Sequence, residues 1–111
     1  MNFGDISIKY QGFYPEQSLR EYIYLMTQEI HEESPNGSIL RAVYLRRGKN
    51  IKAIIQINSA VGTFFTMAND VSLRGVTEKV TQQMRGHLNK WKARRFQRLS
   101  DKTPHFLEHR A

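Results

Sequence analysis

Basic side chains are concentrated in the last third of the chain, where they could bind phosphate groups. Residues 70–98 contain eight Lys or Arg residues against two acids, Asp70 and Glu78. The first 33 residues have two bases and six acids, and residues 34–69 have five bases and no acid. The net charge is +7 and the pI is about 10.0. This separation of sign favours a polyanionic partner over an evenly solvated surface.

The basic residues of this segment form two rows if the segment is helical. At about 100° per residue, Arg74, Arg85 and Lys92 fall beside the apolar stripe, and Lys79 and Lys90 fall on its other flank. Solubility helices usually alternate charge at i, i+4, which this segment does not do. The predicted polyanion-binding residues are Arg74, Lys79, Arg85, Lys90, Lys92, Arg94, Arg95 and Arg98 in this segment, and Arg46, Arg47 and Lys49 at a hairpin.

The uncharged residues of the same region have expected places as well. Polar side chains are expected on the exposed surface between the basic rows, namely Thr81, Gln82, Gln83 and Asn89. Trp91 falls on the apolar stripe and is expected in the core, with His87 half-buried beside it. Phe64 or Phe65 could stack on nucleobases, but aromatic residues in strands are more often simple β-formers.

Other chemistries find little support in the residue types. The chain has no cysteine, which excludes disulfides, thiolate zinc sites and a cysteine nucleophile. The four histidines, His31, His87, His105 and His109, lack the spacing of a metal site, and Glu32 and Glu33 are adjacent and would point apart on a helix. We expect no metal, no cofactor and no catalytic residue. Two alternatives stay open: a small RNA-processing enzyme using His87 with a neighbouring Lys, and a module that binds an acidic protein partner.

The first half of the chain predicts a strand followed by a helix. In "DISIKYQG", apolar Ile6, Ile8 and Tyr10 alternate with polar residues, which is typical of a strand with one buried face. The next segment, 16–34, has apolar residues at i, i+3, i+4, i+7 and i+11, which predicts an amphipathic helix that ends at "SPNGS". Pro15 suits the start of that helix.

Three strands and a long helix are predicted for the rest. The strands are "ILRAVYLR", "IKAIIQIN" and "TFFTMA", joined by short turns. Helical periodicity begins at about Val71 and runs to about Arg95, through Leu73, Val76, Val80 and Met84. The tail contains Pro104 and looks loosely ordered.

These elements predict an α+β fold in the order β-α-β-β-β-α. One four-stranded sheet with both helices packed on one face buries both apolar stripes, and the first strand can pair in parallel after its helical crossover. Residues 1–98 are expected to form a single domain and residues 99–111 a flexible tail. No apolar run reaches the roughly 20 residues that a membrane span needs, and no signal peptide is seen at the N-terminus. We expect a cytoplasmic protein with no membrane partner.

The chain resembles the ribosome hibernation-promoting factors and ribosome-associated inhibitor A, also called sigma-54 modulation proteins. The matching stretches are "ISIKYQGFYPEQSLREYI", "IKAIIQIN", and "AND" followed by the long basic helix ending "LNKWKARR". The resemblance covers about residues 5–95. The chain is similar to the short forms of the family, because it lacks room for the second, dimerising domain of the long forms.

The resemblance implies a non-catalytic factor of stress or stationary phase. Members of that family bind in the cleft of the small ribosomal subunit, contact its rRNA and occlude the sites of tRNA and mRNA. The matching basic positions implied for rRNA contact are Lys79, Arg85, Lys90, Lys92, Arg94 and Arg95. Arg74, Arg98, Arg46, Arg47 and Lys49 are added on charge alone. Neither self-association nor the pairing of ribosomes can be inferred from the sequence.

Overall fold

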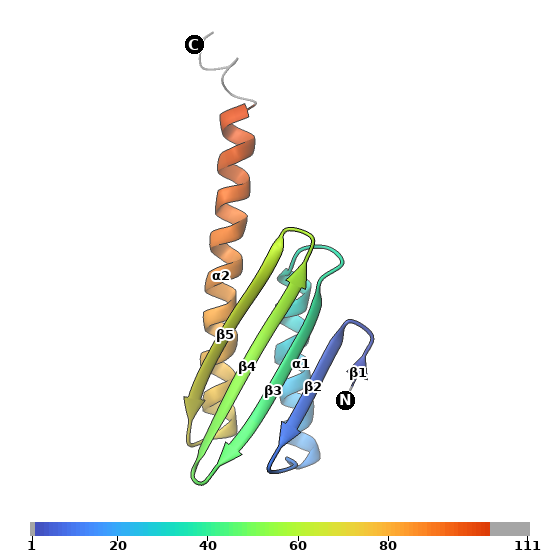
Figure 1. The fold of residues 1–111 in the computed structure, drawn as a ribbon, viewed down its shortest axis with the longest axis vertical. Coiled ribbons are helices and arrows are strands. Elements are labelled where there is room, and N and C mark those ends of the chain that lie inside the picture. Colours follow the sequence, from blue (N-terminus) through green and yellow to red (C-terminus); the bar gives the residue numbers. More distant parts are fainter. Residues whose placement is uncertain (1, 103–111) are drawn as a thin grey trace.

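The computed structural model describes residues 2–102 of the chain, and the side chains of residues 4–95. Two helices cover one face of a mixed sheet, and in Figure 1 both lie behind the strands. The elements in chain order are β1 (Asn2–Phe3), β2 (Ile6–Gln11), α1 (Gln17–Glu33), β3 (Ile39–Arg47), β4 (Asn50–Ser59), β5 (Gly62–Asp70) and α2 (Leu73–Lys102).

The sheet has the order β1-β2-β3-β4-β5. Strands β2 and β3 are parallel and joined through α1, whereas β3, β4 and β5 are antiparallel neighbours. The predicted α+β fold with four main strands and two helices on one face is therefore confirmed. The two-residue strand β1, which pairs with β2, was not predicted.

Alternation along the strands decides which side chains enter the core. On β4, Ile51, Ala53, Ile55 and Ile57 are buried, while the residues between them face the other side of the sheet. Both helices place an apolar stripe over the buried face. The core residues of the helices are Ile23 and Ile30 of α1, and Leu73, Val76, Val80, Met84 and Leu88 of α2.

The start of α2 is held by a compact cap. The Ser72 hydroxyl accepts a 2.9 Å hydrogen bond from the Gly75 amide, and the Asp70 carboxylate accepts one of 3.2 Å from the Ser72 amide. A Cβ on Gly75 would lie 2.6 Å from the Asp70 carboxylate and 2.7 Å from the Ser72 hydroxyl. Gly75 is therefore explained by the close approach of the cap side chains to the helix backbone.

The far end of α2 lies beyond its predicted end at about Arg95. The helix continues to Lys102, because no Gly or Pro occurs between Arg95 and Pro104. Residues 99–102 of the predicted tail are thus helical, and residues 103–111 lie outside the described part of the chain. The last turns of α2 project past the sheet, beside the turn between β4 and β5 (Figure 1).

Three residues of α2 are placed differently from the sequence expectation. Thr81 is fully buried, and its hydroxyl donates a 2.7 Å hydrogen bond to the Thr77 carbonyl, which removes the cost of burying it. His87 is exposed rather than half-buried. Trp91 is only half-buried rather than part of the core.

Candidate nucleic-acid interface

The predicted basic residues lie at two ends of the molecule. The hairpin between β3 and β4 brings Arg46, Arg47 and Lys49 together at one end of the sheet, with Gly48 at φ 60° in the two-residue turn. The projecting end of α2 lies at the other end (Figure 1). Strand β4 spans this separation, about 30 Å for its length. The two groups of cations therefore do not form one continuous surface.

The cations in the first half of α2 are engaged within the protein. Lys79 Nζ lies 3.0 Å from the Asp70 carboxylate, and hydrogen bonding from Lys79 is the main cause that lowers the pKa of Asp70. The Arg74 guanidinium lies over the ring of Tyr22, 4.6 Å from its centroid. At the hairpin, Arg46 lies over the ring of Phe13 at 5.4 Å.

Arg85 links the two helices. Its Nε donates a 3.1 Å hydrogen bond to the Glu33 carboxylate, and its terminal nitrogen lies 3.6 Å from the Glu29 carboxylate. Only 34% of the Arg85 side chain is exposed. Its charge is therefore largely balanced by α1, although the sequence pattern placed it in a free basic row.

The second half of α2 carries a cluster of cations that is not neutralised. Lys90, Lys92, Arg94 and Arg95 form this distal cluster, and within the described side chains none of them makes an ion pair. No acidic residue occurs between Glu78 and Asp101 to offset them. Lys90, Arg94 and Arg95 are exposed and Lys92 is half-buried, so most of this charge is available to an external anion. Arg98 follows in the helix, but its side chain lies outside the described set.

A groove runs beside the distal cluster, between α2, the β4–β5 turn and the segment after α1. It has a volume of about 630 Å³, and its walls include Pro35, Asn36, Val61, Phe64 and Trp91. Arg94 and Arg95 complete it. The Trp91 ring meets Phe64 edge-on, with centroids 6.2 Å apart and an interplanar angle of 74°. We call this hollow the Trp91 groove.

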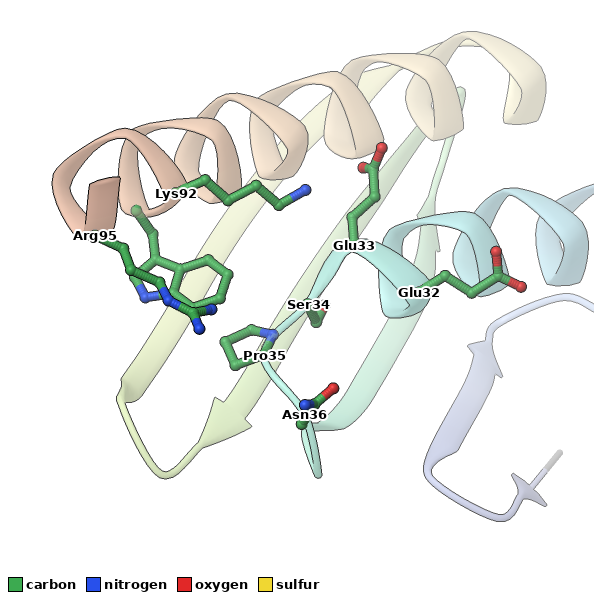
Figure 2. Close-up of a pocket in the computed structure, with 8 residues that line it drawn as sticks. Glu32, Glu33, Ser34, Pro35, Asn36, Lys92 and Arg95 are labelled. Carbon is green, nitrogen blue, oxygen red and sulfur yellow. The ribbon is translucent and has the colours of Figure 1, made fainter. Parts of the chain in front are cut away.

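A second hollow of about 470 Å³ adjoins the Trp91 groove and shares the indole with it. Figure 2 shows this second hollow, with Lys92 and Arg95 on the side of α2 and Glu32 and Glu33 on the side of α1. The two carboxylates make it unfavourable for anions. Among the described side chains no acidic residue lines the Trp91 groove, so this groove is the more favourable of the two for an anion.

The opposite face of the sheet is uncovered and carries the second predicted stacking residue. Phe65 is 49% exposed there and lies next to Gln56 across the strand pair, whereas Phe64 turns to the helix side and packs on Trp91. The two adjacent phenylalanines therefore serve different faces, as the period of two requires. The open face was not among the predicted sites.

Comparison with known proteins finds similarity in structure but not in sequence. No protein-family model matches the chain, and no curated protein matches it significantly. The N-terminal domain of Protein Y from Thermus thermophilus is similar, with a TM-score of 0.68 and 14% identity over 82% of this chain and 99% of that chain. A ribosomal subunit interface protein from Coxiella burnetii has a TM-score of 0.65 and 16% identity over 79% of this chain and 97% of that chain.

The chain has the Protein Y fold. The resemblance seen in the sequence is confirmed at the level of the fold. Within the described residues, no set of three or more His, Asp or Glu side chains could hold a metal ion. No helix in that part of the chain is long and apolar enough to cross a membrane.

Proposed function

We propose that this protein is a non-catalytic factor that binds the small ribosomal subunit through its rRNA. The observation that supports this most directly is the distal cluster, four cations that make no ion pair with any described side chain. They lie on a projecting helix of a fold shared with a ribosomal subunit interface protein. Phosphates would replace the solvent around these side chains and relieve their mutual repulsion. The protein would act in the cytoplasm, during stress or in stationary phase.

Inhibition follows from occupancy in this mechanism and needs no chemical step. A domain held by its helix end in the cleft of the small subunit would occlude the sites of tRNA and mRNA. The Lys and Arg side chains of the distal cluster would fix it there through phosphate contacts that are independent of sequence. Ribosomes held in this way would be idle and protected.

The decisive experiment is sedimentation of small subunits with the purified protein across a salt series. If four or five cations meet phosphates, the logarithm of the affinity falls with the logarithm of salt concentration at a slope of about −3 to −4. The triple variant Lys90→Glu, Lys92→Glu, Arg94→Glu should no longer co-sediment, and its thermal unfolding should change little.

The matched control reverses three charges at the other end of the molecule: Arg46→Glu, Arg47→Glu, Lys49→Glu. It changes net charge by the same amount, so a loss of binding confined to the helix variant shows a localised interface. Normal co-sedimentation of the helix variant would contradict the proposal. Intact rRNA after incubation, with release of bound tRNA, separates occlusion from the nuclease alternative, which predicts cleavage that His87→Ala abolishes.

A further inference from the structure

The Trp91 groove combines a flat apolar wall with free positive charge. Trp91 is held edge-on against Phe64, which fixes the ring while part of its surface stays open. The Arg95 guanidinium lies 5.9 Å from the indole centroid, near the outer limit of a cation–π contact, so a ligand could displace it at little cost. Val61, 60% exposed, forms the opposite rim.

The polar groups of the groove suit an anion attached to a planar ring. Arg94 and Arg95 lie at its helical side, and Asn36 offers an amide that can both donate and accept hydrogen bonds. The described residues that line the groove include no acidic side chain, in contrast to the adjoining hollow with Glu32 and Glu33. An acidic protein segment would use the cations but leave the exposed indole and Val61 without a planar partner.

We propose that the Trp91 groove binds an unpaired nucleobase of single-stranded RNA, with the flanking phosphates on Arg94 and Arg95. The base would stack on the open part of the indole, and Asn36 would contact its edge. Stacking on aromatic side chains suits every base, so the groove would prefer unpaired over paired RNA without reading a strict sequence. This inference rests on the proposed function, because it gives the distal cluster a site for one unpaired nucleotide of the bound rRNA.

Trp91 is the only tryptophan of the chain, so its fluorescence reports on ligands that contact this indole, which lines the Trp91 groove and the adjoining hollow. Titration with a short single-stranded oligonucleotide of RNA should quench the emission in a saturable way. An abasic oligomer with the same number of phosphates should bind more weakly and leave the emission nearly unchanged. Equal binding and equal quenching by the two oligomers would overturn the inference, because the contact would then be with the backbone alone.

Variants test the same point through the anisotropy of labelled RNA. Trp91→Ala should weaken binding about 5- to 150-fold, the range expected for loss of one stacked base. Because Trp91→Ala also removes packing on Phe64, a second variant leaves the core untouched: Val61→Glu places a carboxylate in the rim of the groove. Its matched control is Val71→Glu, at a valine 69% exposed near the start of α2.

Val61→Glu should weaken RNA binding several-fold more than Val71→Glu, although both change the net charge equally. Equal affinities for the two variants would overturn the inference. Failure of the inference can be distinguished from failure of the proposed function. If only the groove assignment is wrong, the abasic oligomer binds as tightly as RNA, while the triple variant Lys90→Glu, Lys92→Glu, Arg94→Glu still fails to co-sediment with small subunits. If the proposed function is wrong, that triple variant co-sediments normally.

Discussion

The Arg85 guanidinium donates a 3.1 Å hydrogen bond to the Glu33 carboxylate, and this contact ties α2 to the end of α1. The two residues are 52 positions apart in the sequence, and each neutralises the other at the surface between the helices. The same helix therefore has two kinds of cation. Those near the sheet stabilise the domain, and those beyond it remain available to a partner.

Replacing Arg85 should affect stability more than binding. We expect Arg85→Gln to lower the free energy of unfolding by about 0.2–1 kcal/mol, the range for exposed ion pairs. Lys90→Gln removes the same charge from the same helix, at a position without an ion pair among the described side chains. The free energy of unfolding should then change by less than about 0.5 kcal/mol, while the affinity for small subunits falls. Urea unfolding and sedimentation measure the two effects. The assignment is wrong if Arg85→Gln weakens binding as much as Lys90→Gln at unchanged stability.

The two glycines of α2 should respond in opposite directions to alanine. Gly86 is exposed and a Cβ there would meet no atom within 4 Å, so Gly86→Ala should stabilise the protein by up to about 1 kcal/mol. At Gly75 a Cβ would push the Asp70 and Ser72 side chains out of the cap, so Gly75→Ala should give no gain and a net loss of up to about 1 kcal/mol. Thermal unfolding of the two variants measures both changes in stability. An equal gain in stability at both positions would contradict the prediction, because it would mean that the cap adjusts freely.

Stability should fall at alkaline pH because of buried tyrosines. Burial raises the pKa of Tyr10 from 10.0 to about 12, and its hydroxyl has no hydrogen-bond partner among the described residues. Below about pH 10 the tyrosine is protonated in both the folded and the unfolded state, so this group does not change stability there. Between about pH 10 and 12 the unfolded state loses its proton first, and stability falls by at most about 1.4 kcal/mol per pH unit.

The Tyr10 contribution can be isolated by substitution. Tyr10→Phe removes both the titrating group and an unpaired hydroxyl, so it should be neutral or stabilising at neutral pH and should reduce the alkaline loss. Burial also raises the pKa of Tyr44, but its hydroxyl lies 3.0 Å from the Thr77 hydroxyl, which makes Tyr44→Phe a poorer test. The measurement is the urea midpoint at about pH 8 and about pH 11. Identical pH dependence in the parent and Tyr10→Phe would contradict the assignment.

Neighbouring residues of β4 should differ sharply in their tolerance of charge. Ile55 is fully buried, so Ile55→Asp should unfold the domain by placing an unpaired carboxylate in the core. Ile54 points to the open face of the sheet and is half-exposed, so Ile54→Asp should leave a folded protein. Circular dichroism of both variants tests this, and a folded Ile55→Asp protein would mean that the register of β4 is wrong.

Local patterns in the sequence were sufficient for most of the fold. The alternation of Ile51, Ala53, Ile55 and Ile57 predicts the buried face of β4, and the spacing of Val76, Val80 and Met84 predicts the face of α2 that meets it. The end of α2 could also have been predicted correctly, because no Gly or Pro occurs between Arg95 and Lys102. The burial of Thr81 could not have been predicted from the sequence, since threonine is usually exposed and its hydroxyl finds a carbonyl partner only in the formed helix.

The sequence by itself determined how much positive charge the last helix has and which side of it faces away from the core. Only the tertiary structure decided which of those charges are free. Periodicity relates a residue to its own helix, whereas the partners of Arg74, Arg85 and Trp91, namely Tyr22, Glu33 and Phe64, come from other elements. Such contacts exist only after distant segments have packed together, which is why the sequence predicted a cationic helix and only the structure showed which of its cations have partners within the domain.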